Sequence, residues 1–332
     1  MFSLLPYNTF ALDVHAQHGI VVNALSDLKF PLPEPYIILG RGSDVLFTSD
    51  FEGTALINNI RGVDILHEDN EYLVRVGGGE ILDELIVKLL NQGICGLENL
   101  SAIPGTVGAA PIQNIGAYGV EIGDFIASVE VCDLKSGKTF TLDKDACQFG
   151  YRDSYFKRHP QEHLFIIYVN FRFPDEPKLI LSYQGLRDQD LKDAQAVRAQ
   201  VRALRARKLP DPRYVGNAGS FFKNPLVDAQ TVTRLREQYP DIPVFTAEGG
   251  RYKLAAGWLI DKAGCRGITH GHAGTWEHQA LVLVNRGQAK PHEIVSLAKY
   301  VSTQVMAHFG IELVPEVRLY GRNGEVAWDL LL

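Results

Sequence analysis

Three polar side chains stand in sequence surroundings that can support chemistry. Ser220 lies in GNAGSFFKNP, where glycine and asparagine can hold a hydroxyl at a fixed angle. Arg152 lies in GYRDS, where a structural salt bridge to Asp153 or another acid is the ordinary expectation. Glu316 lies in the apolar run LVPEVRLY. A hydroxyl can donate a proton, and a guanidinium can stabilise a carboxylate or a developing negative charge.

Spacing alone leaves the roles of these residues open. The serine does not stand in G-x-S-x-G, and no histidine and aspartate can be paired with it, so a turn or helix-cap serine competes with a proton donor. A strand is predicted over 313–320, and its alternation places Glu316 and Arg318 on the same face as Val314. The two charges are therefore either exposed partners or part of a buried polar site.

Two glycine turns can each form a nest of backbone N–H groups that binds an anion. Neither is a G-x-G-x-x-G opening a helix nor a P-loop, so a Rossmann site has no support. Tight structural turns are the alternative reading, and the triple glycine at 77–79 adds moderate weight to a phosphate-rich cofactor. The turns comprise Gly40, Arg41, Gly42, Ser43 and Asp44, and Pro104, Gly105, Thr106, Val107 and Gly108.

The elements that must position these residues follow from periodicity and punctuation. A turn at Ser136-Gly137 predicts a hairpin, and Pro291 and Gly310 bracket the last predicted helix. Strands are predicted at 36–39, 45–47, 55–58, 72–76, 129–134, 166–173, 281–285 and 313–320, and helices at 81–90, 191–208, 228–239, 254–263 and 291–309.

Two segments have unusual patterns. In the helix 191–208, Leu191, Ala194, Val197, Val201 and Leu204 are predicted to face inward, while Arg198, Arg202 and Arg205 share another face. Residues 93–123 are rich in glycine and almost uncharged. Because a flexible linker would be polar, this segment indicates backbone packed closely against something bulky.

Composition restricts the class of protein. The 332 residues suit two or three domains, and a formal charge of −6 argues against broad binding to nucleic acid or acidic lipid. The four cysteines are spread widely, so we expect reduced thiols and no metal site. The opening residues MFSLLPYNTFALD carry no secretory signal, and no stretch of 18 apolar residues occurs, so a cytoplasmic protein without membrane insertion is expected.

Taken in order along the chain, eight segments resemble the UDP-N-acetylenolpyruvoylglucosamine reductase family, in the form with a substrate-covering tyrosine loop. They span residues 7 to 321. Each segment alone is a weak match, but the whole set in this order is specific for the family. The segments are YNTF, LGRGSD, GLENLSAIPGTVGAAPIQNIGAYGVE, GYRDSYFK, KLPDP, GNAGSFFKNP, KLAAGWLID and PEVRLYG.

The resemblance implies an α+β fold of three domains. Two of them, residues 1–65 and residues 66–208, would form a vanillyl-alcohol-oxidase-like (PCMH-type) FAD-binding unit. A C-terminal tail, residues 311–332, would return to the first of these domains. The third, residues 209–310, would be an α/β substrate-binding domain. The glycine-rich segment would then let the backbone approach the flavin closely.

The implied reaction is NADPH-dependent, with non-covalent FAD, and reduces enolpyruvyl-UDP-N-acetylglucosamine to UDP-N-acetylmuramate for peptidoglycan. Hydride passes from reduced flavin to the vinyl methylene carbon, and negative charge builds on the adjacent carboxylate as an enolate. By resemblance, Ser220 is the proton donor, Glu316 the catalytic carboxyl group and Arg152 the enolate-stabilising cation. The enzyme would be a monomer with a UDP-sugar and NADPH as partners.

The resemblance also assigns contacts. Flavin contacts fall on residues 40–44 and 104–108, with Ala117 and Tyr118 nearby. Substrate contacts fall on Tyr183, Lys208, Asn224 and Arg318. Two places depart from the family pattern. Asp44 stands where asparagine is common and brings a charge to the expected pyrophosphate nest, and GTWEHQALVL, around Trp276, lacks the histidine or serine often seen there.

Three other functions are alternatives to this reductase activity. A carbohydrate oxidase on the same scaffold would not need Ser220, Glu316 and Arg152, and the signature of covalent flavin attachment is missing from this sequence. A non-catalytic nucleotide sensor would have no need to keep the three residues either. A serine hydrolase would work without flavin.

Overall fold

The computed structural model describes residues 1–331, which group into two compact units. The first comprises Met1–Gln17, Gly42–Glu52 and the chain from Arg207 onward, and the second comprises His18–Arg41 and Gly53–Ala206. Three elements run from one unit into the other: β2 (His15–Val22), β5 (Phe51–Asn58) and α3 (Ala194–Lys208). The expected division into three domains stays a prediction, and Leu332, the last residue of the expected tail, lies outside the described residues.

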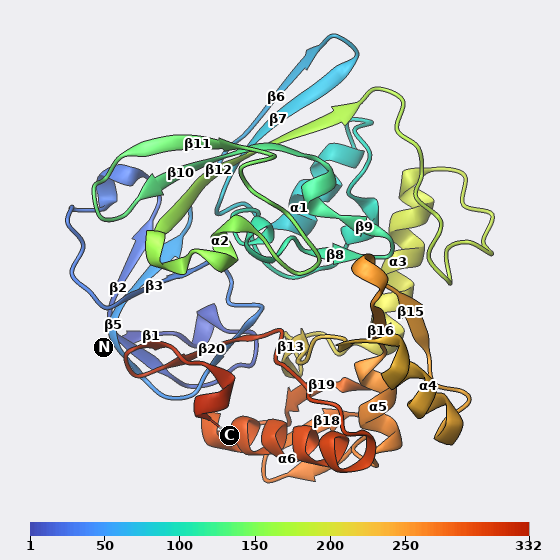
Figure 1. Cartoon of the computed structure of the whole chain (residues 1–332). Helices are drawn as coiled ribbons and strands as arrows, with labels where there is room; N and C mark the ends of the chain where they lie inside the picture. Colours follow the sequence, from blue (N-terminus) through green and yellow to red (C-terminus); the bar gives the residue numbers. More distant parts are fainter. Residues whose placement is uncertain (332) are drawn as a thin grey trace. The chain divides into compact units, whose positions relative to one another are not determined.

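The second unit is built on an antiparallel sheet of order β11-β10-β12-β7-β6 (Figure 1). The predicted hairpin turn is confirmed, because Gly137 joins β10 to β11 at a φ of 72°. The elements of this unit are β3 (Tyr36–Leu39), β6 (Val63–Glu68), β7 (Glu71–Gly77), β8 (Gly116–Ala117), β9 (Val120–Glu121), β10 (Ile126–Asp133), β11 (Thr139–Asp143), β12 (Leu164–Pro174), α1 (Leu82–Leu90) and α2 (Tyr155–Arg158).

The core of this unit lies between the sheet and α1. Leu85, Ile86 and Leu89 recur at helical spacing and are buried, as the sequence predicts. They join one apolar cluster with Val169 and Phe171 of β12. Each such side chain contributes about 1.5–3 kcal/mol when fully buried, so this cluster fixes α1 on the sheet.

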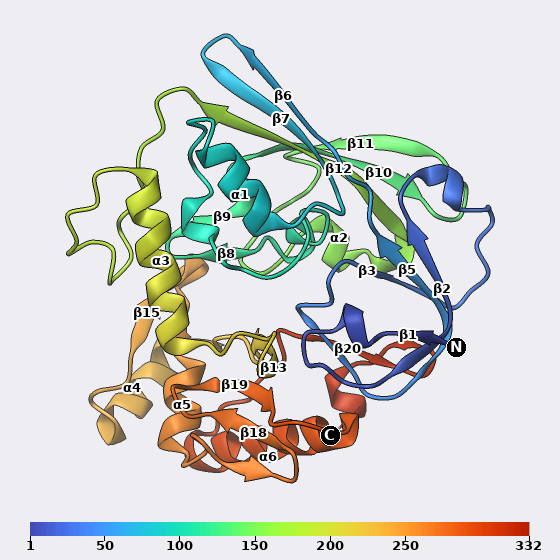
Figure 2. The same cartoon turned by 180° about the vertical axis from the view of Figure 1, so that it is seen from behind.

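The first unit carries a second antiparallel sheet, of order β13-β19-β18-β17, with α5 and α6 packed on β19 (Figure 2). A smaller sheet of order β14-β16-β15 lies in the same unit. The elements are β1 (Phe2–Ser3), β4 (Val45–Phe47), β13 (Gly216–Ser220), β14 (Leu226–Val227), β15 (Val244–Thr246), β16 (Tyr252–Leu254), β17 (Thr269–His270), β18 (Ala273–Trp276), β19 (Gln279–Asn285), β20 (Arg318–Gly321), β21 (Gly324–Glu325), α4 (Ala229–Gln238), α5 (Ala256–Lys262) and α6 (Pro291–Phe309).

Helix ends in this unit follow their capping residues. Pro291 opens α6, and Gly310 closes it in the left-handed conformation at a φ of 63°. Asp228 caps α4 by accepting the N–H of Thr231 at 2.8 Å. The predicted bounds of α6 are confirmed, and those of the other helices are within a few residues.

The predicted strand 313–320 is wrong in length. Only β20 (Arg318–Gly321) is a strand, and it pairs in parallel with β4, Arg318 opposite Val45. Residues 313–317 are connected to their neighbours through a single bridge between Pro315 and Phe222. Because proline has no N–H, the ladder cannot continue through it. The predicted alternation is nevertheless present, since Val317 and Leu319 are buried while Glu316 and Arg318 are half-buried.

The predicted face of α3 is also wrong in one respect. Val197 and Val201 are buried as expected, but so is Arg198. Its guanidinium donates to both oxygens of Asp83 on α1, at 2.6 and 3.1 Å, and this pairing explains how it is buried. Asp83 also accepts the N–H of Ala102 at 2.7 Å. The helix begins at Ala194 rather than at Leu191.

We expect Asp83→Asn to lower the free energy of unfolding by about 2 kcal/mol, since it removes charge-assisted hydrogen bonds from a buried arginine. Burial alone would raise the pKa of Asp83, but Arg198 and the Ala102 N–H outweigh it and lower that pKa. The ionised form therefore stabilises the fold above the unfolded-state pKa of about 3.9, and this contribution is lost as the pH falls through the folded-state pKa.

Urea unfolding at several pH values measures this effect. The difference between the wild-type chain and Asp83→Asn should shrink below about pH 4. Asp64→Asn is the matched control, because Asp64 is exposed and lies 3.9 Å from Arg75. An Asp83→Asn effect as small as that of the control would contradict the assignment.

Candidate active site

Ser220 is held by a bulge at the end of β13. The pairing of β13 with β19 shifts register between Asn217 and Ser220, and Gly219 in between has a φ of 70°. The Asn217 side chain stabilises this turn: Oδ1 accepts the N–H of Gly219 at 2.9 Å, and Nδ2 donates to the carbonyls of Pro210 and Val215 at 3.1 and 2.8 Å. Asn217 is not among the predicted site residues, although its place two residues before a glycine is a turn signal.

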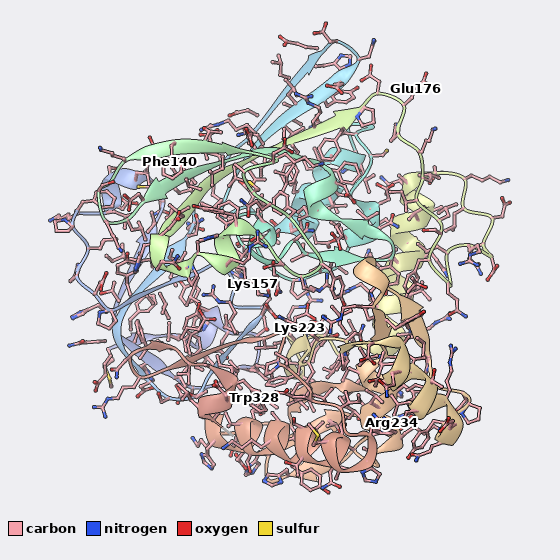
Figure 3. The ribbon with its side chains drawn as sticks, in the orientation of Figure 1. Phe140, Lys157, Glu176, Lys223, Arg234 and Trp328 are labelled. Atoms are coloured by element: carbon pink, nitrogen blue, oxygen red, sulfur yellow. The ribbon has the colours of Figure 1, made fainter. Side chains whose placement is uncertain are left out.

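Two aromatic residues anchor the chain directly after Ser220. Phe221 and Phe222 are fully buried, with ring centroids 4.9 Å apart. Phe221 also lies edge-on to Phe10, and Phe222 to Trp328, which Figure 3 labels in the C-terminal segment. Ser220 itself is half-buried, and the backbone that carries its hydroxyl is held by neighbours on both sides of it in the chain.

Glu316 lies beside this segment. Its backbone N–H donates to the carbonyl of Phe221 at 2.8 Å, and Lys223 donates to the carbonyl of Val314 at 2.9 Å. The structure therefore brings the backbone of Glu316 next to the residue that follows Ser220. The two predicted catalytic residues come from segments that are about 95 positions apart in the sequence and are adjacent in the fold.

Arg318 does not pair with Glu316. Its Nε donates to Oε1 of Glu325 at 3.0 Å and its Nη2 to Oε2 at 2.5 Å, a bidentate contact between β20 and β21. Burial lowers the pKa of Arg318, but Tyr320, Glu325 and Asp44 outweigh it, and the net pKa is raised. Asp44 thus belongs to the electrostatic surroundings of Arg318, and its carbonyl accepts the N–H of Arg318 at 3.0 Å.

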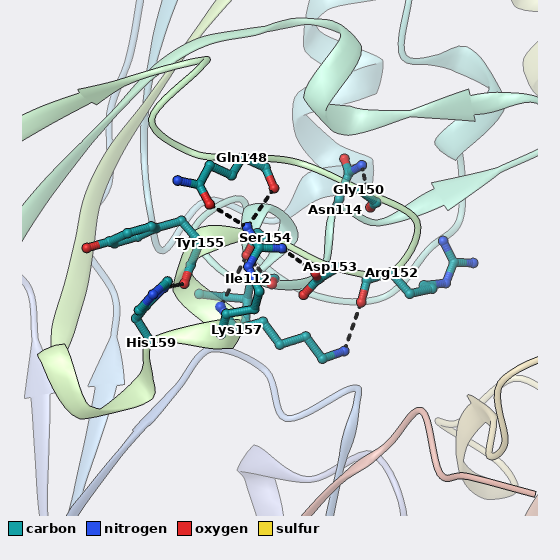
Figure 4. A network of polar contacts seen from close by, with 11 residues as sticks. Ile112, Asn114, Gln148, Gly150, Arg152, Asp153, Ser154, Tyr155, Lys157 and His159 are labelled. Atoms are coloured by element: carbon teal, nitrogen blue, oxygen red, sulfur yellow. Dashed lines mark hydrogen bonds and ion pairs between the residues drawn. The ribbon is translucent and has the colours of Figure 1, made fainter. Parts of the chain in front are cut away.

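Arg152 lies in a tightly bonded turn of the second unit (Figure 4). Its φ of 53° is left-handed, which is uncommon for a side chain of this size. The guanidinium donates to the carbonyl of Gly116 at 2.9 Å, and Lys157 donates to the carbonyl of Arg152 at 3.1 Å. The expected partner Asp153 pairs instead with Arg158. Asp153 is therefore engaged by Arg158, and the alternative of a structural salt bridge from Arg152 to another acid stays open.

The residues around Arg152 explain why the strained turn persists. Ser154 caps α2 and donates its hydroxyl to the carbonyl of Ile112, and Asn114 donates to the carbonyl of Gly150 at 3.1 Å (Figure 4). A left-handed residue costs about 1–2 kcal/mol, which these bonds offset. The turn therefore presents the guanidinium from a rigid base.

The two glycine turns are connected through Gly40 and Thr106. A Cβ at Gly40 would lie 2.2 Å from Oγ1 of Thr106, so only glycine permits this approach. The Thr106 hydroxyl is buried and has no hydrogen-bond partner within residues 1–331. A buried hydroxyl without a partner costs about 1–3 kcal/mol and indicates a missing ligand or water.

The triple glycine has a different role from an anion nest. The N–H groups of Gly77, Gly78 and Gly79 donate to the carbonyls of Gly62, Ile167 and Ile60, each at 2.8 Å, so these amides are engaged within the protein. The carbonyl of Gly78 accepts the N–H of Gly108 at 2.8 Å, and a Cβ at Gly108 would lie 2.9 Å from Cα of Gly78. These glycines support the turn 104–108 from behind.

Tyr118 and Tyr183 lie against each other in the second unit. Tyr118 follows Ala117 at the tip of the β8–β9 hairpin, with a φ of 52°, and its ring is 4.9 Å edge-on from that of Tyr183. Burial raises the pKa of the Tyr118 phenol; nearby Arg205 lowers it and Tyr183 raises it. The structure thus joins an expected flavin neighbour to the expected substrate-covering tyrosine.

The other predicted substrate contacts lie in the first unit. Lys208 is exposed at the end of α3. The Oδ1 of Asn224 accepts the N–H of Ala256, the first residue of α5, at 2.9 Å, and its Nδ2 is the group that can donate to an anion. The first unit therefore holds Ser220, Glu316, Lys208, Asn224 and Arg318, and the second holds Arg152, Ala117, Tyr118, Tyr183 and the turn 104–108.

Comparison with known proteins shows which family this architecture represents. Residues 211–320 match the family described as UDP-N-acetylenolpyruvoylglucosamine reductase, C-terminal domain, and residues 32–143 match the family described as FAD binding domain. The UDP-N-acetylenolpyruvoylglucosamine reductase of Escherichia coli (strain K12) is 44% identical over 333 residues, covering 98% of this chain and 97% of that protein. The chain belongs to the UDP-N-acetylenolpyruvoylglucosamine reductase family.

Further relatives agree with this membership. The reductase of Haemophilus ducreyi is 43% identical, covering 98% of this chain and 96% of that protein. The crystal structure of the reductase from Thermus caldophilus superposes with a TM-score of 0.67 at 22% identity, over 96% of this chain and 97% of that one. The predicted α+β fold class with its FAD-binding portion is thereby confirmed. Within residues 1–331, no helix is long and apolar enough to span a bilayer.

The residues of the turn 104–108 fit the FAD of this family. The buried hydroxyl of Thr106 has no partner within residues 1–331, so it offers a donor to the pyrophosphate. The N–H groups of Val107 and Gly108 donate to carbonyls of the protein, so they support the turn and do not form a nest. The four cysteines are free thiols, and burial raises the pKa of Cys147 to about 12, with Asp143 adding to the shift.

We expect Thr106→Val to act in opposite directions on the apoprotein and on FAD binding. The change removes a buried hydroxyl that has no protein partner, so the thermal midpoint of the apoprotein should stay constant or rise. If the hydroxyl donates to FAD, affinity should fall by about tenfold, the loss of one charge-assisted hydrogen bond.

Flavin fluorescence titration and thermal unfolding measure the two effects separately. Thr141→Val on the exposed strand β11 is a control for the substitution itself. Unchanged FAD affinity in Thr106→Val would exclude the hydroxyl as a cofactor contact.

Proposed function

We propose that this chain catalyses the NADPH-dependent, FAD-mediated reduction of enolpyruvyl-UDP-N-acetylglucosamine to UDP-N-acetylmuramate, a step of peptidoglycan precursor synthesis. Membership of the reductase family over 98% of the chain carries this proposal. The backbone bulge that carries Ser220 and the unpartnered hydroxyl of Thr106 support it in this chain. When bound, FAD supplies the hydride that NADPH donates and the vinyl methylene carbon receives.

Ser220 is the proposed proton donor. After the methylene carbon gains a hydride, the neighbouring carbon carries the enolate and must gain a proton. The serine O–H bond breaks as the new C–H bond forms, and one hydride with one proton then balances the reduction of the double bond. The bulge at Gly219 and the buried Phe221 support this role, because they fix the backbone that carries the hydroxyl.

Arg152 is the proposed stabiliser of the enolate. A guanidinium offers paired donors to a carboxylate, and charge held on a rigid turn need not reorganise as the enolate develops. Its left-handed backbone and the bonds made by Ser154 and Asn114 support this assignment. Glu316 is the proposed catalytic carboxyl group that works with Ser220. Its backbone N–H donates to the carbonyl of Phe221, the residue after Ser220, and this bond supports the assignment.

The remaining residues are proposed to bind. Lys208 and the Nδ2 of Asn224 contact the diphosphate, and Tyr183 covers the substrate. Since Glu325 engages Nε and Nη2 of Arg318, a contact of Arg318 with the substrate would use Nη1. FAD is held without a covalent bond by residues 40–44 and 104–108, with Ala117 and Tyr118 beside it.

We also propose that the enzyme acts as a cytoplasmic monomer in which residues 1–65 with the tail and residues 66–208 form the FAD-binding domains and residues 209–310 the substrate-binding domain. Free thiols in all four cysteines suit a reducing compartment. A net charge of −6 gives no reason to expect nucleic acid as a partner.

The function is tested by separating the two half-reactions of Ser220→Ala. NADPH should reduce the bound flavin of the variant at about the wild-type rate, while reoxidation by the enolpyruvyl sugar nucleotide should slow by about 10²–10⁴-fold, the usual contribution of a general acid. Stopped-flow absorbance of the flavin follows both steps.

Ser302→Ala is the matched control, since Ser302 is a buried serine of α6 in the same unit. Both of its half-reactions should resemble the wild type. If Ser220→Ala slowed flavin reduction and reoxidation equally, the serine would not be the proton donor.

A further inference from the structure

Asn99 is a buried amide that joins two separate segments. Its side chain is fully buried, and Nδ2 donates to the carbonyls of Tyr118 and Ile180 at 2.8 and 2.9 Å. Because both partners are carbonyl acceptors, the orientation of the amide is fixed by the bonds themselves. Asn99 therefore connects the β8–β9 hairpin to residues 175–193 between β12 and α3.

The two segments that Asn99 joins carry the two facing tyrosines. Tyr118 occupies a left-handed conformation, and its carbonyl is the one that Asn99 holds. Tyr183 lies three residues after Ile180, and its ring is edge-on to that of Tyr118. A Cβ at Gly119 would lie 3.2 Å from Oγ of Ser182, so the hairpin backbone lies close to side chains of the other segment at this point.

The connection has a second anchor, on α3. Leu186 is fully buried against Val197 and Val201, and Nε2 of Gln200 donates to the carbonyl of Gly185 at 3.1 Å. These contacts hold the part of the connection after Tyr183. Asn99 holds the part before it, so Tyr183 lies between two fixed points. Tyr118 packs against the apolar cluster of the second point, and Asn99 holds its carbonyl by a hydrogen bond.

The cost of keeping an asparagine here also points to a specific role. Oδ1 of Asn99 is buried and has no hydrogen-bond partner within the described chain. An unsatisfied buried acceptor costs about 1–3 kcal/mol, which an apolar side chain of similar shape would avoid. The contribution of Asn99 to the structure therefore comes from the two hydrogen bonds that its Nδ2 donates.

We propose that Asn99 is a positioning residue that holds Tyr118 and the Tyr183 segment together, so that the tyrosine is preorganised to cover the sugar nucleotide. This inference rests on the proposed function of Tyr183. Asn99 acts through the two tyrosines and takes no part in the transfer of hydride or proton. Its loss should therefore weaken substrate binding and leave the rates of the chemical steps unchanged.

Two variants test this with the FAD-loaded enzyme. Asn99→Leu removes both bonds, and Asn99→Asp keeps the shape of the side chain but has no donor to offer two carbonyls. For both, we expect the Kd of the enolpyruvyl sugar nucleotide, read from the flavin spectrum, to rise about tenfold, which corresponds to two neutral hydrogen bonds. The rate of flavin reduction by NADPH and the limiting rate of reoxidation at saturating substrate should stay within about twofold of wild type.

Hydrogen exchange supplies a readout that does not depend on activity. Amides of residues 179–187 should exchange faster in both variants, while those of α1 should not change. Asn170→Leu is the matched control, because Asn170 is an asparagine of β12 whose Nδ2 also donates to two acceptors, Ser128 and Glu130. Its Kd for the sugar nucleotide should equal that of wild type.

The outcomes separate this inference from the proposed function. A wild-type Kd in Asn99→Asp would overturn the positioning role, and so would a fall in the limiting rate without a change in Kd. Asn99→Asp decides the matter if Asn99→Leu does not fold. Failure of the wild-type enzyme to reoxidise with the sugar nucleotide would instead contradict the proposed function itself.

Discussion

The contact of Gly78 with Gly108 is the constraint on which the cofactor site depends. The carbonyl of Gly78 accepts the N–H of Gly108, and the nearest atoms are so close that a Cβ on Gly108 would not fit. The turn 104–108 is thus supported by backbone contacts, with the Asn58 side chain packed beside both glycines. The Thr106 side chain packs against Gly40, where a Cβ would not fit, and its buried hydroxyl has no partner within residues 1–331.

The segment that carries Ser220 is also held by few contacts. A single side chain, Asn217, satisfies three backbone groups and permits the bulge that contains Gly219. Phe221 then fixes the chain after the serine and offers its carbonyl to Glu316. In both places a strained or unusual backbone is stabilised by its immediate surroundings, which is typical of sites where a group must be presented without reorganisation.

Much of this arrangement could be predicted from the sequence. The helix at α6, the hairpin at Gly137 and the inward face of α1 follow from periodicity and turn residues, which depend on local chemistry. The family followed from ordered motifs, and the comparisons agree with it. The glycine-rich segment was expected to pack closely against something bulky. At Gly108 the close neighbour is the backbone of another glycine, and the expected contact with FAD stays a prediction.

What could not be predicted depends on partners distant in the sequence. Arg198 was placed on the wrong face because its partner, Asp83, lies 115 positions away. Arg318 pairs with Glu325 instead of Glu316, since strand pairing decides which carboxylate is near. Asn99 has no periodic or turn signal at all. Its importance is visible only once Tyr118 and Ile180 lie on either side of it.

The most direct test of the account is the visible spectrum of the purified chain under anaerobic conditions. The chain should be yellow, lose its flavin absorbance on addition of NADPH, and regain it when the enolpyruvyl sugar nucleotide is added. A chain that binds no FAD, or whose reduced flavin is not reoxidised by that substrate, would contradict the central claim.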